Sequence, residues 1–280
     1  MAGDHADPDQ RSPAVGPDGA PIPTRELLGV PIALVDYGRA MDVMDGLIAR
    51  RRPGYVCAAP VHALMLAQDD SEMRAALLGS TLTVPDGMPL VWAVKLLGEG
   101  LRDRVYGPDL MRRYNDRCAE RGHRVWLYGG RDEPSLEQLK LRLSERHPGI
   151  EIVGGWSPPF RPLTTAEEEL VAKQVNDASP DVLWVGIGVP KQEKWMARMR
   201  DRLEVPVMCG VGAAFDFHAG LVPQAPRWMQ DRGLEWAYRA AQEPRRLLPR
   251  YVYYNPRFVA SFARQLARER RGRPAVDSGS

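Results

Sequence analysis

Residues 181–195 contain the pattern that most restricts how this chain can fold. An apolar run at 181–185 predicts a buried strand, two glycines follow it, and Pro190 predicts the first turn of a helix. Where a parallel strand passes into a helix, backbone N–H groups and the positive end of the helix dipole face one crevice, which favours phosphate. The candidate ligand-binding residues of this turn are Gly186, Gly188, Lys191 and Gln192.

Much of the chain repeats this alternation of apolar runs and amphipathic segments. The runs predict strands at 30–35, 55–59, 124–128, 150–153, 181–185 and 205–209. The amphipathic segments predict helices at 61–78, 133–146 and 165–178, and after Pro89 and Pro190. Such alternation implies parallel crossover units. The predicted fold class is therefore α/β, a Rossmann-like parallel sheet with helices on both faces, whose ligands bind at the carboxyl ends of the strands.

Composition divides the chain into four parts. Residues 1–23 are rich in Pro, Gly, Asp and Ala and have no periodicity, so we expect a disordered N-terminal tail. The Rossmann-like domain is expected at 24–226, a C-terminal Arg-rich helical appendage at 227–273, and a second disordered tail at 274–280. Within the domain, Thr165 and Glu168 predict a capping box at the start of a helix.

The appendage is strongly basic. From residue 239 to 273 it contains ten arginines, no lysine and two acidic residues. Asn255 and Pro256 predict the start of a helix, and the apolar residues that recur on one of its faces are Phe258, Val259, Phe262 and Leu266. A basic amphipathic helix suits the headgroup region of an anionic membrane. The alternative is a terminal helix that packs its apolar face on the domain.

Bulk composition excludes several classes. A net charge of +2 over 280 residues implies no polyanionic partner, and the three cysteines, Cys57, Cys118 and Cys209, predict reduced, buried thiols. No stretch approaches the roughly 18 apolar residues of a membrane span, and no signal peptide is recognisable. We therefore expect the protein on the cytoplasmic side of the membrane.

Four positions are candidates for chemistry, and each has a structural alternative. Asp86 precedes a predicted helix, where it is either a cap or a general base that accepts a proton from a sugar hydroxyl. Arg104 is either a surface charge or a ligand of a diphosphate. Asp216, between two aromatics after a glycine turn, is either a cap or an acceptor for a nucleobase or sugar. Phe160 in a proline-rich loop either packs or stacks on a base.

The histidines and acids form no spaced set of metal ligands, and the Asp-x-Asp triplet of many sugar-nucleotide enzymes is absent from the sequence. This favours a site without metal, in which arginines and helix dipoles stabilise a leaving diphosphate. The arginine candidates are Arg239, Arg245, Arg246 and Arg250. Gly186 and Gly188 lack the third glycine of the dinucleotide fingerprint, so NAD is poorly supported as a cofactor.

Eight short blocks occur in an order and spacing that resemble the WecG/TagA/CpsF family of glycosyltransferases (family 26). They are residues 85–89, 104–110, 127–130, 186–193, 210–217, 224–228, 233–239 and 243–246. The resemblance implies transfer of a sugar, with inversion and without metal, from a UDP-sugar to an undecaprenyl-type lipid-linked acceptor. The sugar would be of the N-acetylmannosamine type, mannosaminuronate or glucose, and the product a cell-surface polysaccharide or teichoic-acid-like polymer.

The resemblance also implies roles for particular residues. Asp86 would be the base, Gln192 and Asp216 would line the UDP site, and Arg104 and Arg239 would contact the phosphates. The appendage would cover the site and touch an anionic membrane from the cytoplasmic side, and family members form homo-oligomers. Many members carry Thr-x-Asn after the second strand, whereas residues 58–60 here are Ala-Ala-Pro.

That departure leaves the sugar specificity and the activity open. A non-catalytic nucleotide-sugar-binding protein and a NAD-linked oxidoreductase are the main alternatives. RNA binding is disfavoured because no aromatic stacking platform accompanies the arginines, so we expect no nucleic acid partner.

Overall fold

A six-stranded parallel sheet forms the centre of the computed structural model, which describes residues 14–16 and 19–272. The strand order is β4-β3-β8-β7-β5-β6. The strands are β3 (Gly54–Ala59), β4 (Leu82–Pro85), β5 (Arg124–Gly129), β6 (Glu151–Trp156), β7 (Val182–Gly186) and β8 (Val207–Gly210). All neighbouring strands pair in parallel, so their carboxyl ends share one edge. This confirms the predicted α/β class.

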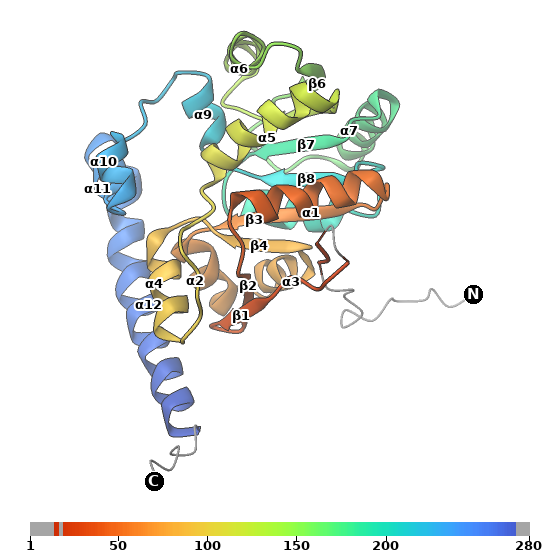
Figure 1. The fold of residues 1–280 in the computed structure, drawn as a ribbon. Helices are drawn as coiled ribbons and strands as arrows, with labels where there is room; N and C mark the ends of the chain where they lie inside the picture. Colours follow the sequence, from red (N-terminus) through yellow and green to blue (C-terminus); the bar gives the residue numbers. More distant parts are fainter. Residues whose placement is uncertain (1–13, 17–18, 273–280) are drawn as a thin grey trace.

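Helices cover both faces of the sheet and form two apolar cores (Figure 1). One face is covered by α1 (Tyr37–Ala49), α5 (Gly107–Arg121), α6 (Glu133–Arg146) and α9 (Ala214–His218). The other is covered by α2 (Val61–Asp69), α3 (Ser71–Gly79), α4 (Met88–Leu96), α7 (Thr165–Ala178) and α8 (Lys191–Met199). Strands β3 and β4 are buried along their whole length because both faces are covered. This explains the continuous apolar run of β3, whereas β4, which contains Thr83, was not predicted as a strand.

The N-terminal segment departs from the prediction. The strand predicted at 30–35 is β2 (Val30–Ala33), and it pairs antiparallel with β1 (Thr24–Leu27) in a separate two-stranded sheet. Residues 1–13 and 17–18 of the predicted disordered tail lie outside the described residues. Its last part is ordered, because Val15 bridges Pro21 and the Ile22 side chain is buried in the core.

Two helix boundaries were predicted wrongly. The helix expected at 61–78 is divided into α2 and α3, because the Asp70 side chain caps α3 by accepting a hydrogen bond from the Met73 N–H at 2.9 Å. The capping box lies one residue earlier than predicted, between Thr164 and Glu167, where both reciprocal hydrogen bonds form.

The appendage consists of α10 (Arg227–Asp231), α11 (Glu235–Gln242) and the long α12 (Pro244–Gly272), which packs along α2 (Figure 1). The predicted helix start at Asn255 is wrong, because α12 continues through Pro249 and Pro256. Contacts with the domain hold it in place: Arg257 forms two hydrogen bonds of 2.8 Å with Asp69, and Phe258 and Phe262 are buried. The side of α12 that carries Phe258 and Phe262 therefore packs on the domain, which was the alternative to membrane contact. Val259, predicted on the same side, is 64% exposed.

Candidate active site

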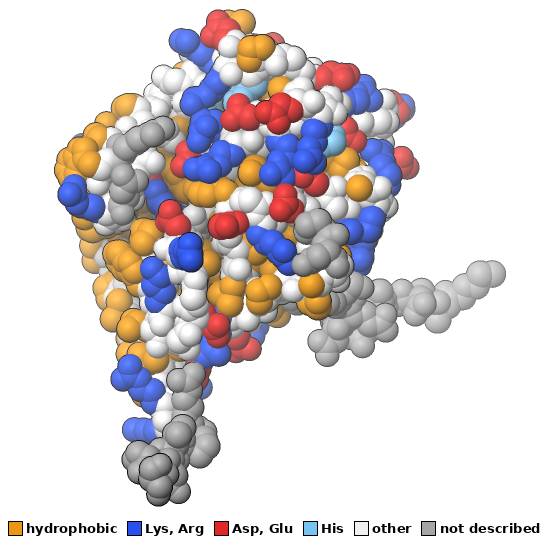
Figure 2. Space-filling model, in the orientation of Figure 1, with side chains coloured by type: hydrophobic (Ala, Val, Ile, Leu, Met, Phe, Trp, Pro, Cys, Tyr) orange, Lys and Arg blue, Asp and Glu red, His pale blue; other side chains and the backbone are white. Residues whose placement is uncertain are grey.

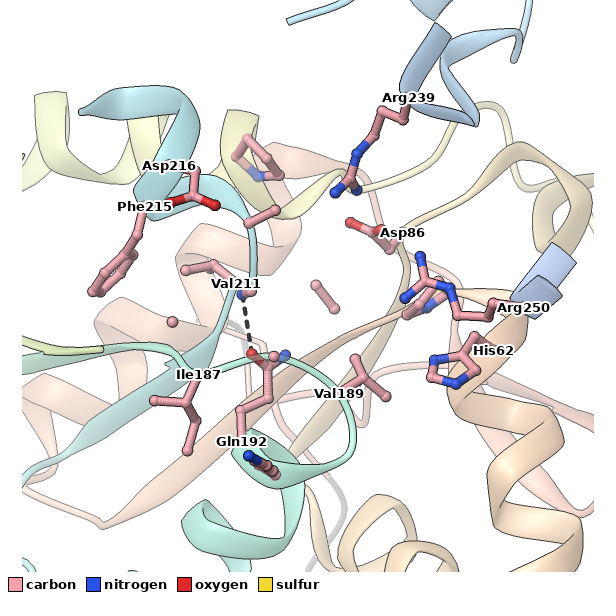
Figure 3. A pocket seen from close by; sticks show the side chains of 18 of the residues that line it. His62, Asp86, Ile187, Val189, Gln192, Val211, Phe215, Asp216, Arg239 and Arg250 are labelled. Atoms are coloured by element: carbon pink, nitrogen blue, oxygen red, sulfur yellow. Dashed lines mark hydrogen bonds between the residues drawn. The ribbon is translucent and has the colours of Figure 1, made fainter. Parts of the chain in front are cut away.

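A cavity of about 970 Å³ lies at the carboxyl ends of β3, β4, β7 and β8. Its walls are the loops that follow these strands, the proline-rich loop at 158–163, and the inner side of α11 and α12. Figure 3 shows its centre, with Asp216 on one side and His62 on the other. The position agrees with the expectation that ligands of such sheets bind at the strand ends. The volume lies at the upper end of the range of roughly 300–1,000 Å³ that is usual for pockets that bind small molecules.

Asp86 follows β4 and faces this cavity (Figure 3). Its Oδ1 accepts a hydrogen bond of 2.7 Å from the backbone N–H of Gly107, the first residue of α5. Burial raises the pKa of Asp86 to about 6, the Gly107 N–H and the charge of Arg104 lower it, and the charge of Glu235 raises it. A carboxylate with a pKa near neutrality suits proton transfer at physiological pH. Asp86 does not cap the helix that follows it, because the N-cap of α4 is Gly87 and no side chain caps this helix; its carboxylate instead binds the first residue of α5 and faces the cavity.

Arg104 does not lie free on the surface. Its Nη2 donates a hydrogen bond of 2.7 Å to Glu235 of α11, and both side chains are largely buried. The hydroxyl of Tyr106 donates to the same carboxylate, and the Arg104 guanidinium lies 4.3 Å from the centre of the Tyr106 ring. Glu235 was missed by sequence reasoning. The only signal was its place inside the block at 233–239, because its partners lie far away in the chain.

The turn after β7 is shaped by its glycines. A side chain at Gly186 would meet the Phe215 ring at 2.6 Å, so only glycine allows that close approach. Gly188 has a φ of 79°, which glycine adopts without strain. We predicted Pro190 in the first turn of α8, but it is the N-cap of this helix. Lys191 is the first residue of α8 and lines the cavity. The Gln192 N–H donates to the Gly188 carbonyl at 3.0 Å, so fewer N–H groups are free than the motif suggested.

Gln192 is 1% exposed, and its amide joins two parts of the site. Its Oε1 accepts a hydrogen bond from the Gly212 N–H at 3.0 Å, and its Nε2 donates to Glu193 at 2.9 Å. Burial raises the pKa of Glu193 to about 7, and one of its carboxyl oxygens has no hydrogen-bond partner in the described part of the chain. The amide therefore fixes the loop after β8 against the start of α8, which sequence reasoning did not foresee.

Asp216 lies in α9 and forms a bidentate ion pair with Arg131, at 2.9 and 3.3 Å. Arg131 was also missed, although it follows the glycine pair at the end of β5. Arg239 enters the cavity from α11 and lies 5.4 Å from the centre of the Phe217 ring. Arg246 pairs with Glu243 at the rim, and Phe160 is 83% exposed there.

Arg239 and Arg250 differ from the other arginines of the cavity. They point toward Asp86 from two sides (Figure 3), and neither forms an ion pair within the described part of the chain. Residues 14–16 and 19–272 contain no group of three or more His, Cys, Asp or Glu side chains arranged to hold a metal ion. All three cysteines are buried free thiols, as predicted.

The sequence profile of the glycosyl transferase WecG/TagA/CpsF family matches residues 25–272. The chain belongs to this family. Two curated relatives, from Bacillus subtilis (strain 168) and Bacillus spizizenii, are both named N-acetylglucosaminyldiphosphoundecaprenol N-acetyl-beta-D-mannosaminyltransferase. The first is 31% identical over 62% of this chain and 66% of its own length, and the second is 31% identical over 66% of this chain and 72% of its own length. The chain thus spans just under two thirds of the first relative.

In this member of the WecG/TagA/CpsF family, the segment after β3 presents few polar groups to the cavity. Ala58 and Pro60 line it where many members carry Thr-x-Asn, and Pro60 is the N-cap of α2 without a side-chain hydrogen bond. The neighbouring Val61 and Val189 are apolar as well. Among the charged side chains that line the cavity near Asp86 are Arg239 and Arg250 of the appendage.

Proposed function

We propose that this protein is an inverting glycosyltransferase that moves a sugar from a UDP-sugar to a hydroxyl of a lipid-linked acceptor. The observation that carries the proposal is the position of Asp86, whose carboxyl has a pKa of about 6 and faces a large cavity between two guanidinium groups. Membership of the family supports sugar transfer, and the names of both relatives support a sugar diphosphate carried by undecaprenol as the acceptor.

In the proposed reaction, Asp86 accepts the proton of the acceptor hydroxyl. The hydroxyl oxygen forms a bond to the anomeric carbon from the face opposite UDP, so the configuration inverts. The bond from that carbon to the phosphate oxygen breaks, and its electron pair leaves with UDP. Arg239, Lys191 and the positive end of α8 stabilise the charge that develops on the diphosphate. We propose that these groups supply that charge without a divalent cation.

Asp216 and Arg131 lie on the opposite side of the cavity from His62, next to the loop that Gln192 fixes. We assign the uridine to this side, because the paired carboxylate and guanidinium can hydrogen-bond a base or a ribose. The relatives suggest N-acetylmannosamine as the sugar. Ala58 and Val189, which line the cavity, have no polar side-chain atoms that could hydrogen-bond the sugar. Transfer assays with related UDP-sugars test this choice.

We also propose that the protein binds the membrane surface peripherally, from the cytoplasmic side. No helix of the described residues has the length and apolar composition that crossing a bilayer requires. Large apolar side chains are exposed together on α4 and the appendage, at Trp92, Leu96, Trp228, Leu234, Trp236, Leu248, Val252 and Val259. We call these eight residues the apolar face. Figure 2 shows hydrophobic side chains along this side of the molecule, with Lys and Arg nearby.

The deciding experiment measures UDP binding and sugar transfer with the same preparations. Calorimetry with EDTA present should detect UDP binding to the wild type and weaker binding to Asp216→Ala. With UDP-N-acetylmannosamine and a short-chain N-acetylglucosaminyl diphosphate lipid, Asp86→Asn should lose transfer by a factor of about 10³ or more while it still binds UDP. Transfer by Asp86→Asn near the wild-type rate would rule out the assigned base. UDP binding without any transfer by the wild type would favour a non-catalytic nucleotide-sugar-binding protein.

A further inference from the structure

His62 and Arg250 form a second polar cluster in the cavity, on the side away from Asp216 (Figure 3). His62 lies in the first turn of α2 and Arg250 lies in α12, and the ring of Tyr254 packs edge-on against the imidazole at 4.7 Å between centroids. The mechanism proposed above uses neither side chain. The cluster joins the domain to the appendage at the point where the cavity approaches the apolar face.

Both side chains have a buried polar atom that has no hydrogen-bond partner among the described residues. These atoms are Nδ1 of His62 and Nε of Arg250. Burial, and then the charge of Arg250, lower the pKa of His62 to about 4, so the imidazole is neutral at physiological pH. Buried polar groups without a partner are costly, and in native proteins they usually meet a ligand or a water molecule. The cluster therefore has hydrogen-bonding capacity that the described chain does not use.

The charge of the cluster favours an anionic ligand. Arg250 forms no ion pair within the described residues, and its guanidinium lies 5.4 Å from the centre of the Tyr251 ring. Of the acids that line the cavity, Glu72, Asp216, Glu235 and Glu243 are each paired with another cation, and Asp86, toward which Arg250 points, forms no ion pair within the described residues. A guanidinium next to an imidazole N–H matches the oxygen atoms of a phosphate. A phosphate group in the cavity would give the guanidinium of Arg250 an anionic partner that the described residues do not supply.

The surroundings indicate which phosphate binds here. Trp236 lines the cavity, is 48% exposed and belongs to the apolar face, and its ring packs edge-on against Tyr251 at 5.8 Å between centroids. Leu248 and Val252, also in the apolar face, lie two positions before and after Arg250 in α12, and so on the opposite side of the helix from it. The connection between the cavity and the apolar face is therefore Trp236. A lipid attached to a phosphate at Arg250 would leave the cavity along this side chain.

We propose that His62 and Arg250 bind the diphosphate of the lipid-linked acceptor and so direct its sugar hydroxyl toward Asp86. The donor diphosphate then lies on the side of Lys191 and Arg239. This assignment rests on the proposed function, because it takes a lipid-linked sugar diphosphate as the acceptor. His62, which lies outside the eight sequence blocks, would then bind the acceptor and not the UDP-sugar.

The test measures binding of a fluorescent N-acetylglucosaminyl diphosphate with a short alkyl chain, independently of turnover, and UDP binding by calorimetry. The variants are His62→Phe, which keeps the ring packing on Tyr254, and Arg250→Gln. The matched control is Arg257→Gln, which breaks the contact of α12 with Asp69 outside the cavity. His62→Phe and Arg250→Gln should each weaken binding of the sugar diphosphate about tenfold and change UDP binding less than twofold. Arg257→Gln should change neither.

The outcomes separate this proposal from the proposed function. Equal binding of the sugar diphosphate by the wild type and both variants would overturn the subsite alone. An equal loss of UDP binding, or the same loss in Arg257→Gln, would overturn it too, since the cluster would then serve the donor or the packing of α12. Competition by short-chain phosphatidylglycerol as strong as by the sugar diphosphate would assign the cluster to membrane headgroups instead. A wild type that binds neither UDP nor the sugar diphosphate would overturn the proposed function itself.

Discussion

Glu235 of α11 accepts a hydrogen bond of 2.7 Å from Arg104, a residue 131 positions earlier in the chain. The same carboxylate accepts the hydroxyl of Tyr106, and Arg104 and Glu235 both influence the pKa of Asp86. One carboxylate of the appendage therefore holds two side chains beside the assigned base. This links the position of the appendage to the electrostatics of the site.

We expect Glu235→Ala to be strongly destabilising, because it leaves a buried guanidinium without its partner. The free energy of unfolding should fall by about 3–5 kcal/mol, the usual cost of breaking a buried ion pair. Glu235→Gln keeps an acceptor oxygen for Arg104 and should cost less. Urea unfolding checks both values. Lys173→Ala, which breaks an exposed pair with Asp177, is the control and should cost under about 1 kcal/mol.

The pH dependence of transfer should report the ionisation of Asp86. Because a base must be ionised, kcat/KM should fall about tenfold per pH unit below the pKa of about 6. The negative charge of Glu235 raises this pKa, so Glu235→Gln should move the acidic limb of the profile to lower pH. The profile is measured with the sugar donor below its KM. An acidic limb that stays in place in Glu235→Gln would contradict the electrostatic link between the two carboxylates.

Asp86 should also reduce stability at neutral pH. Its pKa in the folded chain, about 6, lies above the ordinary 3.8, so the folded state binds a proton more tightly than the unfolded state. This penalty is fully present above about pH 6 and disappears as the pH falls toward 4. Asp86→Asn should therefore raise the free energy of unfolding at pH 8 by about 1–3 kcal/mol and change it little at pH 3.5. Denaturant unfolding at both pH values checks this, and equal changes at the two would contradict it.

Most strands of the sheet could be predicted from the sequence, because each is marked by a local run of apolar residues. Strands β3 and β7 are buried by helices on both faces, so each is an apolar run that ends in a turn. The family resemblance implied one site for Asp86 and Arg104, and the structure brings both to the cavity. The antiparallel pairing of β2 was not predictable, because an isolated apolar run does not show which strand it pairs with.

The errors arose where distant contacts override local signals. Asn255 and Pro256 have the pattern of a helix start, but the ion pair of Arg257 with Asp69 and the burial of Phe258 hold the segment in a longer helix. The partner of Arg104, Glu235, was missed because no pattern in the sequence connects residues so far apart.

Glu193 should act on nucleotide binding through Gln192. Its carboxyl accepts the Gln192 Nε2, which leaves the amide oxygen of Gln192 directed at the Gly212 N–H. Glu193→Ala removes this constraint, so we expect UDP to bind about tenfold more weakly, in line with the loss of a buried hydrogen bond. Glu193→Gln retains an acceptor oxygen and should change the Kd less than threefold. Calorimetry measures both, and identical Kd values in the Ala variant and the wild type would show that the loop needs no such support.

The apolar face should control attachment to membranes. Leu248 and Val252 are 45% and 71% exposed on α12, so a glutamate at either position leaves the core intact but places a charge where we expect lipid. Each loss of apolar burial is worth about 1–3 kcal/mol, which predicts a fall of about five- to a hundredfold in partitioning. Sedimentation with phosphatidylglycerol vesicles measures it, and Leu141→Glu on α6, 60% exposed outside the apolar face, is the control. Because the exposed arginines of α12 add an electrostatic part, wild-type binding should weaken with salt, whereas the effect of Leu248→Glu should persist. Equal sedimentation of Leu248→Glu and Leu141→Glu would place the membrane contact elsewhere on the molecule.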